Sequence, residues 1–539
     1  MNAPKHPLIT GARVTGLGTL VSRVLGMIRD MAMAALWGLT SGGVADAFVF
    51  AYRIPNLFRR LFGEGALTAS YLPVLSAELE RDPQNAWRLA SVLITWLAAF
   101  LAVLVLLGEG IFALIWLIWG HDPGIGLLMG LSAVLFPYLL LICLAAQLTA
   151  TLHALSHFSI PALTPVILNV CWLTAIWLVW VCPCFEDKQA QAYVIAAAVI
   201  VAGVLQIAVQ LPVLRRLGFR FEYHWPASRD AIRKIGRALA PMLFGLAVTQ
   251  INTFFDSLIA WGLTAPAEGA ERIAWLGGVR YPMQQGAVAA IYYGERLYHF
   301  PLGVLGLAVA AAIFPLLSRH AARGDREKLG SDLTLGLRLV VCLGVPAGVG
   351  LIMLAEPLAR LLFEHGAFTP EDTARTARMI ACYGAGVWAF CALPAVIRGF
   401  YALGDTATPV RTAAAIVGLN LTLNLTLIWP LAEAGLAVAT SISAAVQVLV
   451  LMLIFSRRKS RLQWLSLGRT ALQTLLATAL MAAAGYAVLA QIAYHEGLPG
   501  EILRVLLPLG ASVAVYCTAF RLVGGRELGL LVRGASDDE

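Results

Sequence analysis

Long apolar runs separated by short polar segments occupy almost the whole chain. A run of about 20 apolar residues is long enough for a helix to cross a lipid bilayer. The pattern predicts an all-α, polytopic membrane protein. Its fourteen expected spans are residues 15–36, 44–76, 87–118, 126–154, 160–182, 190–214, 236–262, 287–317, 332–362, 375–402, 408–430, 434–455, 468–492 and 501–522.

The composition agrees with a chain that lies mostly within lipid. Of its 539 residues, 59% are hydrophobic and 13% are charged, and the mean hydropathy is +0.78. Ordinary soluble domains carry about 25% charged residues, so a soluble protein with one membrane anchor is excluded. The net charge of +8 does not indicate a nucleic-acid partner, because the basic residues cluster in short loops between apolar runs.

Lysine and arginine are concentrated in alternate loops, and such loops usually remain in the cytoplasm. Basic segments follow the sixth, eighth and twelfth predicted spans, at 215–237, 319–328 and 457–469. By contrast, 37–44 and 120–124 contain no lysine or arginine. We therefore expect both termini to lie in the cytoplasm.

A weak internal repeat divides the chain. The second predicted span ends in Tyr71-Leu-Pro-Val-Leu-Ser76, and the eighth ends in Ile313-Phe-Pro-Leu-Leu-Ser318. Six spans separate the two copies, so they point the same way across the membrane, as in two-lobed transporters built from parallel repeats. The expected divisions are an N-lobe at 1–214, a cytoplasmic amphipathic linker at 215–235, a C-lobe at 236–459, and two extra spans with a cytoplasmic tail at 460–539.

The first two predicted spans carry many charged residues. One charge at the centre of a spanning helix costs roughly 2.5–3.5 kcal/mol on insertion scales, so such residues usually face a protein interior or a water-filled cavity. Several lie four or seven positions apart, which places them on one helix face. A shared polar cavity is the favoured interpretation, and charges that reach the membrane surface from helix ends are the alternative. These residues are Arg23, Arg29, Asp30, Asp46, Arg53, Arg59, Arg60 and Glu64.

At these positions the sequence resembles a known family. The matching motifs are Ser22-Arg23-Val24-Leu25-Gly26, Arg29-Asp30, Asp46-Ala47-Phe48, Pro55-Asn56-Leu57-Phe58-Arg59-Arg60, Glu64-Gly65-Ala66 and Glu295-Arg296-Leu297. In this order and spacing they are similar to the MurJ (MviN) family of lipid II flippases, which belongs to the MOP exporter superfamily.

The resemblance implies a transporter and no enzymatic activity. Its substrate would be lipid II, the undecaprenyl-pyrophosphate-linked disaccharide-pentapeptide used in peptidoglycan synthesis. The protein would move lipid II from the cytoplasmic to the periplasmic leaflet of the bacterial inner membrane by alternating access. Membrane lipids and other cell-wall synthesis proteins would be its further partners.

The resemblance also implies roles for single residues. Arg23, Arg29 and Arg296 occupy positions of essential cavity arginines in the family, and Asp46 matches its acidic position. Glu295 stands where the family often has aspartate. The expected substrate-binding residues are Arg23, Arg29, Arg53, Arg59, Arg60 and Arg296, and the expected charge-pairing or gating residues are Asp30, Asp46, Glu64 and Glu295. This set has two more positive than negative charges, which matches the roughly two negative charges of a pyrophosphate diester, and arginine's planar fork suits phosphate oxygens.

Two other functions remain open from the sequence. One is a MOP-type exporter of another lipid-linked oligosaccharide, and the other is a membrane enzyme of the lipid-sugar pathway. The enzyme is disfavoured because the sequence has no phosphate-binding loop and no carboxylate cluster of the kind that binds magnesium. Cys182 and Cys184 lack further cysteine or histidine partners at zinc spacing, so no metal site of that kind is expected.

A second polar group lies in the predicted C-lobe. Asp256, Asn420, Asn424 and Thr440 offer carboxylate, amide and hydroxyl oxygens, which suit a hard monovalent cation such as sodium. An interhelical hydrogen-bond cluster with a neutral Asp256 is the equally supported alternative. Sodium, protons or the membrane potential therefore remain open as the energy source, and no other cofactor is expected.

Overall fold

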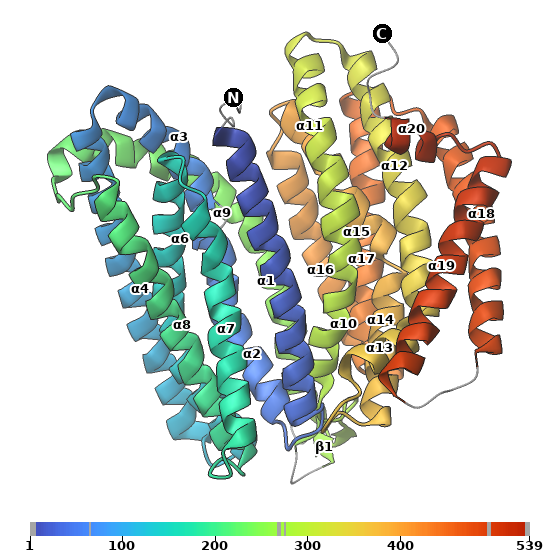
Figure 1. The fold of residues 1–539 in the computed structure, drawn as a ribbon, viewed down its shortest axis with the longest axis horizontal. Helices are drawn as coiled ribbons and strands as arrows, with labels where there is room; N and C mark the ends of the chain where they lie inside the picture. The colour runs from blue at the N-terminus through green and yellow to red at the C-terminus, as the bar shows by residue number, and fades with distance from the viewer. Residues whose placement is uncertain (1–6, 64–65, 267–270, 274–275, 493–496, 534–539) are drawn as a thin grey trace, which may run out of the picture. The chain divides into compact units, whose positions relative to one another are not determined.

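The structure is a computed structural model that describes residues 7–63, 66–266, 271–273, 276–492 and 497–533. Helices make up nearly all of these ranges (Figure 1). A short antiparallel hairpin joins β1 (Arg272–Ile273) to β2 (Val279–Arg280). The chain divides into two compact units, Met1–Glu271 and Arg272–Glu539, and each is described here by itself.

The first unit is a bundle in which α1 packs on α7, α7 packs on α8, α6 packs on α8 and α2 packs on α5. Aspartates at 82, 122 and 187 accept backbone hydrogen bonds at the starts of α4, α5 and α8, which satisfies otherwise unpaired N–H groups. The elements of this unit are α1 (Pro7–Trp37), α2 (Val44–Phe58), the π-helical segment η1 (Arg59–Gly63), α3 (Ala66–Arg81), α4 (Pro83–Trp119), α5 (Pro123–Leu135), α6 (Tyr138–Ala154), α7 (Ser159–Val181), α8 (Lys188–Arg216) and α9 (Trp225–Gly262).

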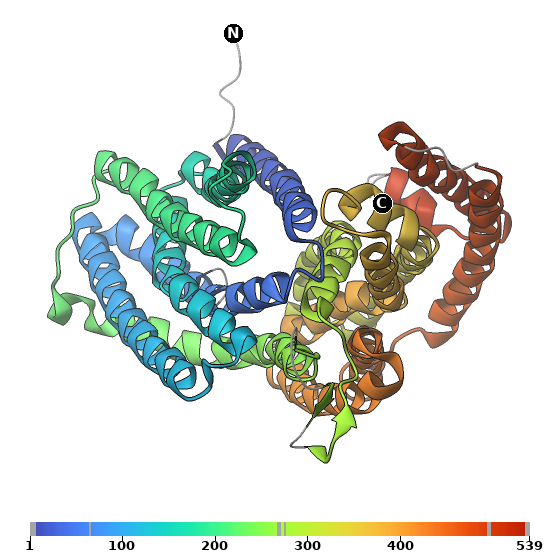
Figure 2. The same cartoon turned by 90° about the horizontal axis from the view of Figure 1, so that it is seen from below.

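The second unit has a core between α11, α12, α15 and α17, where Leu337, Val396 and Phe455 are fully buried. The helices α18 and α19, red in Figure 2, pack on each other, and α18 also packs on α12. The elements are α10 (Ala287–Pro301), the π-helical segment η3 (Leu302–Gly306), α11 (Leu307–Ala322), α12 (Arg326–Met353), α13 (Ala355–Phe363), α14 (Pro370–Gly384), α15 (Val387–Ala402), α16 (Ala407–Leu431), α17 (Glu433–Arg458), α18 (Trp464–Gln491), α19 (Leu498–Leu522) and α20 (Glu527–Arg533).

The all-α membrane class predicted from the sequence is confirmed. Ten helical segments of the described chain are long and apolar enough to cross a membrane, and the pair α14–α15, bent by 41°, makes an eleventh. The other three predicted spans, 15–36, 44–76 and 236–262, fall in α1, α2–η1–α3 and α9, which hold most of the polar residues singled out above. The count of fourteen therefore stays a prediction.

The two copies of the repeat share one local architecture. Each starts with a glycine in the left-handed region, Gly43 at φ 80° and Gly286 at φ 86°, which glycine adopts without a steric penalty. Each continues as an α-helix that contains a late proline, Pro55 or Pro301, and then widens into a π-helical segment. Proline removes one backbone hydrogen bond. The π-helical segment therefore follows the point at which the backbone hydrogen bonds of the α-helix are interrupted.

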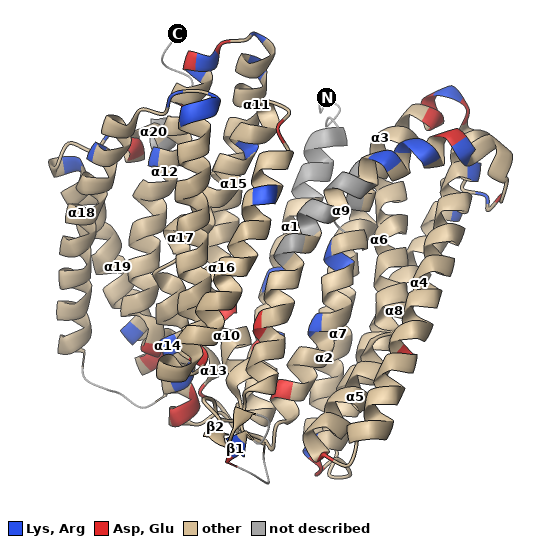
Figure 3. Ribbon diagram, turned by 180° about the vertical axis from the view of Figure 1, so that it is seen from behind, with Lys and Arg blue, Asp and Glu red and all other residues tan. Residues whose placement is uncertain are grey.

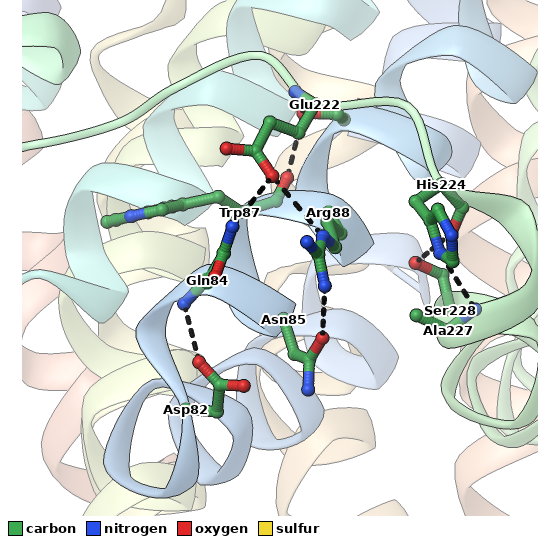
Figure 4. A network of polar contacts seen from close by, with 10 residues as sticks. Asp82, Gln84, Asn85, Trp87, Arg88, Glu222, His224, Ala227 and Ser228 are labelled. Carbon is green, nitrogen blue, oxygen red and sulfur yellow. Dashed lines mark hydrogen bonds and ion pairs between the residues drawn. The ribbon is translucent and has the colours of Figure 1, made fainter.

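The predicted linker at 215–235 is only partly a separate segment. Its last residues belong to α9, and an irregular stretch at 217–224 joins α8 to α9. The carboxylate of Glu222 accepts hydrogen bonds from Arg88 at 3.2 Å and from Gln84 at 3.4 Å, and its N–H donates to Ser91 (Figure 4). The linker is therefore tied to α4.

Helix α9 makes its contacts with α2, α3 and α4, so the contact-based division falls after residue 271. The repeat had placed this helix at the start of the C-lobe. By the repeat, α9 corresponds to the start of the C-lobe, whereas by its packing it belongs to the first unit. The predicted lobe boundaries stay a prediction.

Two glycines of α12 provide a stability test. A Cβ atom at Gly348 would overlap the carbonyl oxygen of Gly384 and lie 3.3 Å from Cβ of Val387, whereas one at Gly350 would meet nothing within 4 Å. We expect Gly348→Ala to lower the free energy of unfolding by about 1–3 kcal/mol through overpacking. Gly350→Ala should be neutral or stabilising by up to about 1 kcal/mol. Thermal unfolding of the purified variants measures both, and equal midpoints would contradict the close packing of α12 on α14.

The loop between α15 and α16 predicts a pH effect. Asp405 accepts hydrogen bonds from Thr408 and pairs with Lys459 Nζ at 2.7 Å. Burial alone would raise the pKa of Asp405, but the Lys459 and Thr408 hydrogen bonds outweigh it and lower that pKa to about 2. A depressed carboxylate pKa stabilises the fold above the unfolded pKa, and this contribution disappears as the pH falls through the folded value. We expect Asp405→Asn to lower the free energy of unfolding by about 2 kcal/mol at neutral pH.

The difference in free energy of unfolding between the wild type and Asp405→Asn should be constant above about pH 4 and should vanish between about pH 4 and pH 2. Unfolding of both proteins across this range separates the Asp405 contribution from that of other carboxylates, which are common to both. A difference that persists unchanged at pH 2 would mean that the pairing with Lys459 is not the cause.

Candidate functional site

Within the first unit, Arg29 is a buried arginine that contacts a carboxylate, an amide and an aromatic ring. Its side chain is buried, at 6% exposure, and its guanidinium donates to the Asp30 carboxylate at 2.8 and 3.1 Å. A third hydrogen bond reaches Asn169 Oδ1 at 3.2 Å, and the guanidinium carbon lies 4.4 Å from the centre of the Trp172 ring. Ion pairing, hydrogen bonding and the aromatic face together compensate for the loss of water around the buried cation.

The sequence analysis missed Asn169 and Trp172, the two residues of α7 that orient Arg29. Asn169 also donates to the Ser22 carbonyl at 3.0 Å, so it links α7 to α1 at two points, Ser22 and Arg29. The sequence does contain a feature that identifies Asn169: it is the single asparagine of the apolar run at 159–181. An amide inside such a run usually makes an interhelical hydrogen bond.

The charged residues of α2 and η1 have separate local partners. Asp46 is 2% exposed and lies in the first turn of α2, where the helix dipole favours a carboxylate. Arg53 donates to Ser257 Oγ of α9 at 2.6 Å, and Arg59 donates to Asn56 Oδ1 at 2.8 Å. Arg60 is exposed and reaches Gln250 Oε1 of α9 at 3.5 Å.

Arg23 lies on α1 with an exposed side chain. It is seven residues before Asp30. Glu64 lies outside the described residues. Within the first unit, the structure thus brings Arg29 and Asp30 together and places Arg53 and Arg60 against α9.

In the second unit, Arg296 is positioned by the residue one turn before it. Its guanidinium donates a hydrogen bond to the Tyr292 hydroxyl and lies 4.3 Å from the centre of the same ring. Glu295 accepts a hydrogen bond from the Tyr383 hydroxyl of α14 at 3.5 Å. His299 contacts the Glu295 backbone carbonyl at 2.5 Å. An arginine held against a tyrosine face is fixed in direction.

Arg53 and Arg296 occupy corresponding places in the two repeat copies. Each lies ten residues after the left-handed glycine that begins its helix, Gly43 or Gly286, and shortly before a π-helical segment. Figure 3 shows blue and red positions along α2 within otherwise uncharged ribbon. The repeat therefore supplies one arginine from each copy, six residues before the π-helical segment.

The candidate cation ligands are placed in two units. Asp256 is 5% exposed on α9 of the first unit. Asn420 and Asn424, on α16 of the second, are 2% and 1% exposed, and Asn424 Nδ2 donates to Asn420 Oδ1 at 2.9 Å. The Thr440 hydroxyl donates to the Leu436 carbonyl of its own helix at 2.9 Å. The two asparagines thus form one pair.

Comparison with known proteins gives a consistent result. The family model described as lipid II flippase MurJ matches residues 33–507. The probable lipid II flippase MurJ of Vibrio cholerae is 35% identical, covering 83% of this chain and 82% of its own length. The corresponding protein of Rhizobium tropici is 30% identical, covering 96% and 95%.

Solved structures share the fold. A lipid II flippase MurJ in an inward closed conformation superimposes with a TM-score of 0.71 at 22% identity, over 94% of this chain and 98% of that one. An inward-facing MATE family transporter of the MOP superfamily gives 0.62 at 13% identity, over 84% and 96%. On the family model and the relatives, the chain belongs to the MurJ family of lipid II flippases.

Proposed function

We propose that this protein moves lipid II across the bacterial cytoplasmic membrane, from the cytoplasmic to the periplasmic leaflet. The observation that carries the proposal is the family match over residues 33–507, in a chain whose described part holds at least ten candidate spans. The protein acts as a transporter without a catalytic step. Both termini face the cytoplasm, because the basic loops lie on their side of the membrane.

The pyrophosphate of lipid II is the part that the arginines recognise. Arg296 presents a guanidinium fixed by Tyr292, and Arg53 occupies the corresponding place in the first copy. Arg23, Arg59 and Arg60 add to this set, while Asp30 and Asp46 balance positive charge when no substrate is bound. The planar guanidinium of arginine binds phosphate oxygens through paired hydrogen bonds. During alternating access, the pyrophosphate therefore takes over part of the charge neutralisation that the carboxylates provide without substrate.

The test is depletion of the protein in its native cell, followed by an assay of which leaflet holds lipid II. An externally added enzyme that cleaves lipid II reaches only the outer leaflet. We expect depletion to make most lipid II resistant to cleavage, and re-expression to restore cleavage. Unchanged cleavage, with accumulation of a different lipid-linked oligosaccharide, would favour the alternative exporter function.

Sodium is our proposed coupling ion, as the sequence analysis expects from the side-chain oxygens of Asp256, Asn420, Asn424 and Thr440. All except Thr440 are at most 5% exposed, and buried oxygen atoms of these kinds suit a hard monovalent cation. We expect sodium, compared with potassium at equal ionic strength, to raise the thermal midpoint of the wild type by a few degrees.

Asp256→Asn should abolish that response while keeping a similar side-chain volume. If the wild type has the same thermal midpoint in sodium and in potassium, then protons or the membrane potential drive transport instead of sodium. A potential of about 100 mV supplies about 2.3 kcal/mol for each charge moved.

A further inference from the structure

The second unit contains a cavity of about 530 Å³ where α18 begins and α19 ends, between these helices, α12 and α20. Four arginines line it, and one carboxylate accompanies them. Figure 3 shows blue segments at this end of α18 and beside α20. The lining residues used in the argument are Arg338, Arg469, Thr470, Arg521, Arg526 and Glu527.

One arginine and the carboxylate form the floor of this cavity. Glu527 is 1% exposed, and its Oε1 accepts hydrogen bonds from Arg338 at 2.6 and 3.0 Å and from Thr470 at 2.7 Å. Burial alone would raise the pKa of Glu527, but the hydrogen bonds from Thr470, from a backbone N–H and from Arg338 lower it. Glu527 is therefore ionised at neutral pH and neutralises Arg338.

The remaining three arginines leave the cavity with a surplus of three positive charges. Arg469, Arg521 and Arg526 are exposed, and among the residues that the structure describes none of them forms an ion pair. Arginines at the cytoplasmic end of a span are common, and their side chains often extend toward water. Here, however, they surround a concave space whose floor is already hydrogen-bonded, which gives an anion a place to sit.

The cavity also adjoins a surface suited to lipid chains. Leu472 and Leu475 of α18 are 59% and 58% exposed, and Leu522 at the end of α19 is 82% exposed. In a membrane-spanning pair such side chains face acyl chains. A ligand that joins an anionic head to apolar chains would satisfy both the arginines and the leucines.

We propose that this cavity is a phosphate-binding site, filled by the headgroup of an anionic phospholipid or by free phosphate. Guanidinium groups bind phosphate oxygens through paired, charge-assisted hydrogen bonds. A volume of about 530 Å³ lies within the range of small-ligand sites. A zwitterionic headgroup fits less well, because its ammonium group would face three arginines. The site is separate from the arginines assigned to lipid II.

The test uses the full-length protein in phosphatidylcholine nanodiscs, with phosphatidylglycerol replacing a rising fraction of the lipid. The thermal unfolding midpoint is the readout. We expect phosphatidylglycerol to raise the wild-type midpoint. Because each basic residue near an anionic membrane contributes on the order of fivefold in affinity, the pocket variant should need at least about tenfold more of it. The pocket variant is Arg469→Gln/Arg521→Gln/Arg526→Gln.

A matched control removes the same charge elsewhere in the unit. Arg457 and Arg458 end α17, Arg461 follows it, and all three are exposed. The triple glutamine variant at these positions therefore tests general attraction to an anionic surface. It should respond as the wild type does. All three proteins are first compared in pure phosphatidylcholine, where equal midpoints show that the substitutions leave the fold intact.

A second arm distinguishes the two phosphate sources. Inorganic phosphate replaces chloride at equal ionic strength in pure phosphatidylcholine nanodiscs. A midpoint rise in the wild type but not in the pocket variant assigns the site to free phosphate, and no rise together with a phosphatidylglycerol response assigns it to the lipid headgroup. The proposal is overturned if neither probe shifts the wild type, or if the pocket and control variants lose the response equally.

Discussion

Arg296→Ala is expected to abolish growth of cells that depend on this protein, although the variant reaches the membrane in normal amounts. The change removes a positive charge from the proposed pyrophosphate site and leaves the Tyr292 hydroxyl without its donor. Arg296→Lys should restore little activity, because an ammonium group keeps the charge but not the planar fork. Complementation of a depletion strain measures both variants.

Arg319, at the far end of the adjoining helix α11, provides the matched control. Its side chain is exposed and lies in the last turn of α11, so Arg319→Ala should support normal growth. Full growth with Arg296→Ala would remove this residue from the site, and full rescue by lysine would show that a point charge suffices. Either outcome would refute the phosphate-fork argument.

Arg296 is a sharper test than Arg29, although both positions match the family motif. Arg29 is buried against Asp30, Asn169 and Trp172, so its removal also leaves a buried carboxylate without its main partner. Loss of a buried pair is itself destabilising. Arg296 is only half-buried, so a functional loss there is easier to separate from a folding defect.

Hydropathy predicted the class of fold because the membrane requires long apolar helices. It did not predict where those helices break. The run at 44–76 is divided by η1, and the run at 126–154 is divided near Pro137 between α5 and α6. A proline inside an apolar run signals such breaks, but hydropathy averaging over a window of residues removes that signal.

The site was predicted at the level of charged residues and not at the level of their partners. The charges were visible because lipid does not tolerate them unpaired. Asn169 is 140 residues away from Arg29 in the sequence, and Ser257 is 204 away from Arg53, so only the packing of helices identifies them. Likewise, the sequence shows that residues 43 and 286 are glycines, but not that both adopt the left-handed conformation. That shared conformation, which the folded chain reveals, is what relates Arg53 to Arg296.

The largest stability effect is expected at Arg375 on α14. This side chain is 5% exposed. It donates to Glu433 Oε1 at the start of α17 at 2.8 Å, to the Gln285 carbonyl at 2.6 Å and to the Gln284 carbonyl at 3.4 Å. Gln285 immediately precedes Gly286, which begins α10. One buried arginine thus joins α14 and α17 to the start of the helix that carries Arg296.

We expect Arg375→Ala to lower the free energy of unfolding by about 3–5 kcal/mol, because it leaves the buried Glu433 carboxylate and two carbonyls without their donor. Arg378→Ala is the matched control, since Arg378 is exposed on the same helix and should cost less than about 0.5 kcal/mol. The double variant Arg375→Met/Glu433→Leu should recover much of the loss, because it removes both buried charges. Chemical unfolding of the purified proteins measures these differences. If Arg375→Ala and Arg378→Ala have equal effects, the contacts of Arg375 with Glu433 and with the Gln284 and Gln285 carbonyls do not stabilise the fold.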